Sequence, residues 1–286
     1  MKKIIAGAAL ATLSFLAHAL QPYVAGDKVQ ASDLKGAMAS VAQKLTAAGF
    51  TVIGQHQPKG VAAGTIVVTE PGMLDAIKNV GGTAVVGAPL RVGVKADGAV
   101  SYINPEYWLR AFVRGDYDKV NAAGKKAADK LRATLGDGSA FGGDVPAADL
   151  PRYHYMAFMP RFDDASELKA YGSFEESLKV VRDNLAKGVS KTEKVYEIVI
   201  PEKKIAVIGF SQHDADKGEA WWVNKIGVNH IAALPWEIFI VGNQIYSLAG
   251  RYRTALAWPT LTMGQFMEIS QHPDFTTQMG LDISGF

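Results

Sequence analysis

The chain has 286 residues, with 30 lysines and arginines against 28 acidic residues, and contains no cysteine. The absence of cysteine excludes disulfides, thiolate metal sites and cysteine nucleophiles. The near balance of charge argues against nucleic acid or an anionic membrane surface as a partner.

Residues 1–19 have the pattern of a cleaved signal peptide. Lys2 and Lys3 precede an apolar run over residues 4–16, and the small-x-small sequence at residues 17–19 follows. The run is too short to span a bilayer, which disfavours the alternative of an uncleaved membrane anchor. We therefore expect a periplasmic protein whose mature chain begins near Leu20 and has no membrane span.

Residues 20–135 are expected to form a first α/β unit. Ser32 is a suitable helix cap, Pro71 occupies a position where helices often begin, and the dipeptide Asp97–Gly98 is typical of a two-residue hairpin turn. The expected elements are, in chain order, a helix over residues 32–48, strands over 50–56 and 65–69, a helix over 71–80, a hairpin over 87–103 and a helix over 116–135.

A Gly- and Pro-rich segment follows and begins a predicted linker and connection over residues 136–172. The second α/β unit, residues 173–286, begins with the capping box of Ser173 and Glu176. Its expected elements are a helix over residues 174–187, strands over 194–200 and 204–210, a helix over 218–226, a hairpin over 233–249 that turns at residues 242–243, and a last helix over 261–270.

The two units share one sequence pattern. Residues 71–103 align with residues 217–249 without a gap, so that Gly81 meets Gly227 and Pro89 meets Pro235. The helix end, the strand proline and the hairpin turn all stay in register, which predicts an internal duplication. The expected fold class is therefore α+β, made of two-layer sandwich units in which a sheet carries helices on one face.

These motifs resemble a known family. A helix that ends in AAGF, two strands, a short helix and the strands PLRVGV or LPWEIFIV are similar to the bacterial domain of unknown function family numbered 302. The likeness covers about residues 32–113 and again 173–259. It implies two tandem copies of a two-layer α/β fold that is often exported, and it transfers no catalytic residue.

The second unit differs from the first in ways that suggest a binding site. Trp236 replaces Leu90 of the first hairpin, and Arg251 and Arg253 follow the second hairpin, on one face of any strand there. Arginines so placed can bind a carboxylate or phosphate, with solvated strand charges as the alternative.

The second unit also has an insertion at residues 211–217. It places His213, Asp214 and Asp216 within four residues, where they could ligate a divalent cation or act as acid and base. The alternative is a solvated turn, because aspartates are ordinary turn residues.

The stretch RYHYMAFMPRF, residues 152–162, offers soft metal ligands: His154, Met156 and Met159. In an exported protein without cysteine, imidazole and thioether groups are the soft ligands available to copper. Met263 and Met267 are one helical turn apart and, with His272, could complete such a site. The alternative is a methionine-rich core.

No nucleophile, phosphate-loop or zinc-protease motif occurs in the sequence. We therefore expect a non-enzymatic exported protein that binds a small ligand or a protein partner at the junction of the two units. A periplasmic copper or other metal-binding protein is one alternative, and a hydrolase-like enzyme with an unrecognised acid/base pair is another. The sequence specifies neither a cofactor nor a catalytic residue. The candidate ligand-binding residues are Trp236, Arg251, Arg253, His213, Asp214 and Asp216, and the candidate metal ligands are His154, Met156 and Met159.

Overall fold

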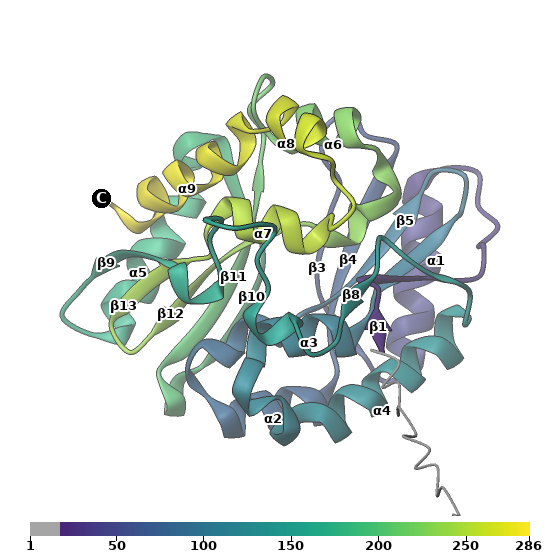
Figure 1. Cartoon of the computed structure of the whole chain (residues 1–286), viewed down its shortest axis with the longest axis horizontal. Coiled ribbons are helices and arrows are strands. Elements are labelled where there is room, and N and C mark those ends of the chain that lie inside the picture. The colour runs from purple at the N-terminus through teal and green to yellow at the C-terminus, as the bar shows by residue number, and fades with distance from the viewer. Residues whose placement is uncertain (1–17) are drawn as a thin grey trace, which may run out of the picture.

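The computed structural model describes residues 18–286, so the predicted signal peptide lies outside the described residues apart from His18 and Ala19. The described chain has a mixed α/β fold in which sheets pack with helices, as the sequence predicted (Figure 1). Within residues 18–286, no helix combines the length and apolar character needed to cross a bilayer.

The first sheet is antiparallel and contains six strands. Its helix α1 (Leu34–Ala47) packs on three of these strands because Met38, Val41 and Leu45 are buried along one stripe. The cap of α1 is Asp33 rather than Ser32, since its Oδ1 accepts a hydrogen bond of 2.7 Å from the Gly36 amide. The strand order is β3 (Thr51–His56), β4 (Ala63–Thr69), β5 (Leu90–Lys95), β6 (Val100–Ile103), β2 (Tyr23–Ala25) and β7 (Ala140–Phe141).

The second sheet is also antiparallel and contains five strands. Ser173 caps helix α5 (Phe174–Ala186), as predicted, and α5 packs on this sheet. The strand order is β10 (Thr192–Ile200), β11 (Ile205–Gln212), β12 (Trp236–Val241), β13 (Gln244–Ser247) and β9 (Ser166–Ala170). A third, two-stranded sheet pairs β1 (Ala19–Leu20) with β8 (Val145–Pro146).

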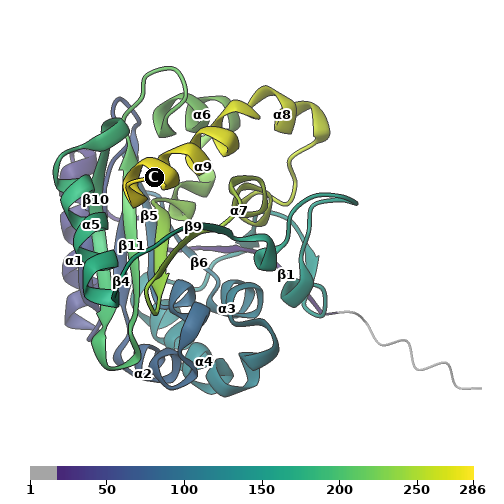
Figure 2. The same cartoon turned by 90° about the vertical axis from the view of Figure 1, so that its left-hand side faces the viewer.

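The remaining helices complete the two halves. Figure 2 shows α1 and α5 on one side of the strands, with α3 and α7 on the other. The first half has α2 (Pro71–Val80), the 3-10 helix η1 (Gly82–Gly87), α3 (Pro105–Val113) and α4 (Tyr117–Leu135). The second half has α6 (Glu219–Ile226), the 3-10 helix η7 (Val228–Ala233), α7 (Gly250–Ala257), α8 (Met263–Glu268) and α9 (Gln271–Ser284).

The expected placement of Arg251 and Arg253 on a strand was wrong. Arg251 and Arg253 belong to helix α7, not to a strand, because the segment GRYRTALA follows the end of β13 and turns directly into a helix. Residues two apart on a helix point in different directions, so the arginines do not share a face. The predicted linker and connection, residues 136–172, runs between the two halves and supplies β7 to the first sheet and β9 to the second.

One order of elements occurs in both halves: helix, two strands, helix, 3-10 helix, two strands and helix. In each half a preceding strand, β2 or β9, pairs with the second strand of the hairpin. An internal duplication would produce this correspondence, and the common origin of the halves stays a prediction.

The halves are joined through reciprocal contacts. Helix η1 of the first half packs on β11 and β12, and η7 of the second half packs on β4 and β5. A Cβ atom on Gly93 would lie 2.6 Å from Ile231 Cγ2, so the missing side chain lets η7 approach β5. The Thr65 hydroxyl donates a hydrogen bond of 2.7 Å to the Ile231 carbonyl. The buried apolar residues of both halves therefore form one core.

Candidate functional site

Four methionines from two distant segments meet at the surface of the second half. Met156 and Met159 come from the loop before β9, and Met263 and Met267 come from α8. All four line one hollow of about 360 Å³. We call these four residues, with Phe158 of the same loop, the methionine patch.

The methionine patch is unusually exposed for apolar side chains. Met156 and Met263 are each 42% exposed, Met267 is 63% exposed, and Phe158 is fully exposed. Within residues 18–286, the exposed large apolar residues are these four and Phe286. Apolar exposure is therefore concentrated at this patch, and concentrated apolar exposure marks interaction sites.

Local contacts fix the two segments against each other. Thr262 and Gln265 form a capping box at the start of α8, and Met263 and Met267 share a face because they are four residues apart. Phe266, which is buried, stacks on Tyr155 with 5.4 Å between ring centroids. The Tyr155 hydroxyl also donates a hydrogen bond of 2.5 Å to the Leu261 carbonyl.

Charged groups at the border of the patch neutralise each other. Arg251 and Asp274 both line the hollow, and Arg251 donates two hydrogen bonds of 3.2 Å to the Asp274 carboxylate. Arg251 is thus brought to the methionine patch, in a role that the sequence did not suggest.

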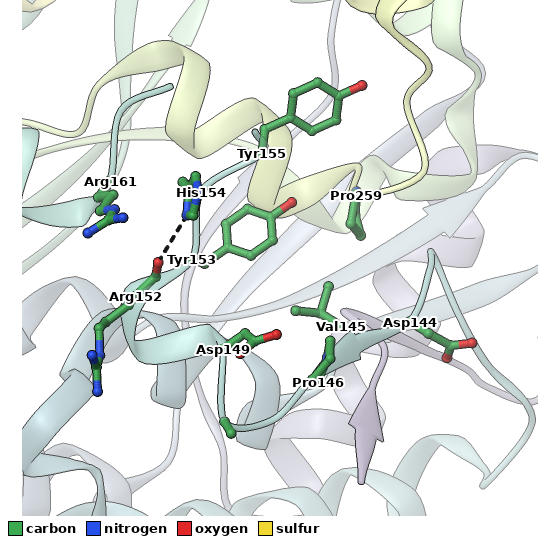
Figure 3. Close-up of a pocket in the computed structure, with 11 residues that line it drawn as sticks. Asp144, Val145, Pro146, Asp149, Arg152, Tyr153, His154, Tyr155, Arg161 and Pro259 are labelled. Carbon is green, nitrogen blue, oxygen red and sulfur yellow. Dashed lines mark hydrogen bonds between the residues drawn. The ribbon is translucent and has the colours of Figure 1, made fainter. Parts of the chain in front are cut away.

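The predicted ligand His154 lies beside the patch. With Met159 it lines a neighbouring hollow of about 650 Å³. It also lines a third hollow of about 580 Å³ that contains Arg152 and Arg161. Its imidazole Nδ1 lies 3.5 Å from the Arg152 carbonyl oxygen, a contact that Figure 3 marks with a dashed line. The structure therefore brings together Met156, Met159 and the two methionines of α8, with His154 at the edge.

His272 lies instead in the interior, in a cluster of aromatic rings that the sequence did not reveal. Its ring centroid is 4.9 Å from that of Trp222, which in turn is 4.6 Å from that of Trp258. Nδ1 of His272 donates a hydrogen bond of 2.9 Å to the Lys217 carbonyl, so Nε2 carries the lone pair. Burial lowers the pKa of His272 to about 3, and the ring is neutral at pH 7.

Trp236 and Arg253 lie together but deep in the protein, each at most 2% exposed. The Arg253 guanidinium carbon is 5.2 Å from the Trp236 ring centroid and 4.8 Å from that of Trp108. Arg253 Nε donates a hydrogen bond of 2.6 Å to Glu237 Oε1. The side chains of these two predicted ligand-binding residues thus contact other residues of the chain and are buried away from solvent.

Glu237 also binds Arg91, which donates from Nη2 to Oε2 over 2.8 Å. Arg91 and Glu237 occupy aligned positions on β5 and β12, so the two hairpins meet through an ion pair across the junction. Tyr196 accepts a further hydrogen bond of 3.4 Å from Arg91, and burial raises the pKa of Tyr196 to about 12. We call Arg91, Glu237 and Arg253 the buried triad.

The insertion at residues 211–217 forms a turn. The Lys191 ammonium hydrogen-bonds to Asp214 over 2.9 Å and lowers the pKa of its carboxyl, which also accepts hydrogen bonds from the amides of Asp216 and Lys217. His213 Nε2 contacts the Ser211 hydroxyl at 2.9 Å. In residues 18–286 no three histidine or acidic side chains are grouped so as to hold a metal ion.

One buried pair has acid/base character. His56 at the end of β3 contacts Glu219 at the start of α6, and both side chains are almost completely inaccessible. Neither residue lines any of the three hollows described above. The pair connects the two halves.

No family model matches the sequence, and no match was found among curated proteins or solved structures. The resemblance to the family numbered 302 therefore stays a prediction.

Proposed function

We propose that this protein is an exported, non-enzymatic metal-binding protein that holds copper(I) at the methionine patch. The observation that carries the proposal is that four thioethers, from two segments about a hundred residues apart in the chain, line one hollow. Thioether sulfur is a soft ligand that favours copper(I), whereas hard cations favour oxygen.

Stability alone does not account for the placement of these side chains. Full burial of a methionine contributes about 1.5–3 kcal/mol, and Met38, Met73 and Met279 are buried in this way. Met156 and Met267 instead leave much of their surface in water. Their positions forgo stabilisation but keep sulfur atoms accessible to an ion.

The mobility of methionine also suits the proposal. The side chain is unbranched and has three rotatable bonds, so sulfurs from the loop and from α8 can adjust their positions around the hollow that they share. His154, which shares a hollow with Met159, offers one further donor. The Arg251 guanidinium is already paired with Asp274, which reduces its repulsion of a cation.

The predicted export supports the same function. Residues 1–19 have a signal-peptide pattern, and a chain without cysteine has no thiolate to bind copper in the periplasm. Thioethers are neutral at all pH values, so binding by the four methionines should be insensitive to pH, in contrast to binding by thiolate.

Anaerobic titration with copper(I) and a competing chelator tests the proposal. We expect one ion to bind, and methyl NMR spectra should show shifts for Met156, Met159, Met263 and Met267. The buried methionines Met38, Met73 and Met279 are internal controls that should not shift. Equal shifts of buried and exposed methyl groups, or no binding, would contradict the proposal.

Leucine substitution separates metal binding from other uses of the patch. The variant with all four patch methionines changed to leucine keeps the apolar surface but loses the sulfur atoms, and it should lose copper(I) binding. Met73→Leu is the matched control, because a Met-to-Leu exchange in the core costs less than about 1.5 kcal/mol. Retention of full affinity by the fourfold variant would exclude thioether ligation.

A further inference from the structure

A separate hollow of about 400 Å³ lies where the two halves meet. Its walls come from β2, β5, β6 and the segment of β7 in the first half, and Asn229 of η7 is the lining residue from the second half. This hollow has no lining residue in common with the methionine patch.

The second-half wall is held firmly against the first half. Helix η7 is fixed by the Thr65 hydrogen bond to the Ile231 carbonyl and by the close approach of Ile231 to Gly93. Lys95 Nζ donates a hydrogen bond of 3.3 Å to Asn229 Oδ1, across the junction. One lining residue of the hollow, Asn229, therefore comes from the second half and is held in place across the junction.

The polar groups around the hollow are mainly donors. Lys95 provides a positive charge, and because Asn229 Oδ1 already accepts from Lys95, the Asn229 amide nitrogen has its two N–H groups free for a ligand. Ser101 and Ser139 add hydroxyl groups. Among the described residues that line the hollow, none is acidic. The nearby Asp97 binds Lys28 and the Ala99 amide.

The rest of the lining is apolar. Phe141 forms one wall, and its ring lies 5.4 Å from the Tyr23 ring centroid and 5.9 Å from that of His230, so the wall is backed by packed side chains. Ala25 and Val100 contribute small aliphatic surface. A volume of this size is within the range of sites for small molecules.

We infer that this hollow binds a small amphipathic carboxylate, whose anionic end pairs with Lys95 and whose apolar body lies against Phe141. Lysine charge, N–H and O–H donors and an aromatic wall are together complementary to such a molecule. The inference gives the protein a second site, independent of copper.

Benzoate is a suitable probe, with benzamide as the neutral molecule of the same shape. In ¹H–¹⁵N spectra of the full chain, benzoate should shift the signals of Ala99, Ser101 and Asn229, and benzamide should bind about tenfold more weakly. Lys95→Met should reduce benzoate affinity about tenfold, and Ser139→Leu, which fills the hollow from an exposed position, should abolish binding. Lys59→Met makes the same charge change in an exposed turn and should leave affinity unchanged.

Three results would overturn the inference: no shifts with benzoate, shifts located elsewhere, or equal binding of benzoate by the Lys95→Met variant. The fourfold methionine-to-leucine variant should bind benzoate as the unmodified protein does. Loss of copper binding with retention of benzoate binding, or the reverse, thus distinguishes failure of one proposal from failure of the other.

Discussion

The buried triad predicts an asymmetric response to mutation. Two guanidinium groups, Arg91 and Arg253, share the single carboxylate of Glu237, and all three side chains are about 1% exposed. Glu237→Gln keeps the size and shape of the side chain but leaves two buried positive charges without a counter-charge. Breaking a buried ion pair in this way costs about 3–5 kcal/mol.

Arg91→Met should cost much less. The variant leaves Glu237 paired with Arg253, which donates to it over 2.6 and 3.4 Å, and methionine fills much of the volume of the removed side chain. The loss is then the 2.8 Å hydrogen bond to Glu237 with its charge and the weaker 3.4 Å hydrogen bond to Tyr196. Removal of a buried cation offsets this loss, for a net cost of about 0–2 kcal/mol.

Urea unfolding followed by circular dichroism measures both variants. Glu106→Gln is the control, because Glu106 forms a partly exposed pair with Arg110 within α3, and its loss should cost less than about 1 kcal/mol. An Arg91→Met variant that is destabilised as much as Glu237→Gln would refute the charge argument.

Three further predictions concern stability. Burial lowers the pKa of His272 to about 3 and that of His230 to about 4, below the ordinary value of 6.5. As the pH falls, the unfolded chain therefore takes up protons at these histidines before the folded chain does. Their full contribution to the free energy of unfolding is present above pH 6.5 and is lost as the pH falls toward 4. The free energy of unfolding should fall by about 4 kcal/mol between pH 7 and pH 5 from these two groups, and His272→Gln should remove about half of that fall; an unchanged pH slope in the variant would contradict the assignment. Gly93→Ala should cost about 1–3 kcal/mol in urea unfolding, because its Cβ would overlap Ile231, and a neutral result would show that η7 moves freely. Tyr155→Phe removes the hydrogen bond to the Leu261 carbonyl, so it should lower the free energy of unfolding by about 1 kcal/mol. It should also weaken copper(I) binding, measured by chelator competition. Unchanged copper(I) affinity would show that this contact does not position the methionine patch.

Much of the secondary structure followed from local sequence signals. The two hairpins, the helix cap at Ser173 and the helix ends at Gly81 and Gly227 were predicted because each depends on residues a few positions apart. The reciprocal half of the predicted capping box is absent, since the Glu176 carboxylate accepts from the Gly172 amide instead. The helix that contains Arg251 and Arg253 was missed because a segment after a hairpin can continue as a strand or turn into a helix. The residues that pack against the segment decide between these two outcomes.

The candidate sites were only partly predictable. Met156, Met159 and the α8 methionines were identified by residue type, and the structure supplies the hollow that they share. Nothing in the sequence marked Phe158 or Tyr155 as part of a site. Whether such an aromatic side chain is exposed or anchors a neighbouring segment depends on the residues that the fold places against it. The hollow at Lys95 and Asn229 has no sequence signature, since its walls come from segments that only the fold brings together.

The sequence by itself determined many of the helices, strands and turns, because propensity, capping and apolar periodicity act over a few residues. Only the tertiary structure decided which side chains are accessible. Trp236 and Arg253 are interior because the fold packs them beneath other residues, where the buried charge of Arg253 is matched by Glu237, and Glu237 in turn binds Arg91 of the other half. The methionines form a candidate site because the same packing leaves α8 and the loop before β9 next to each other at the surface, with their methionine side chains exposed.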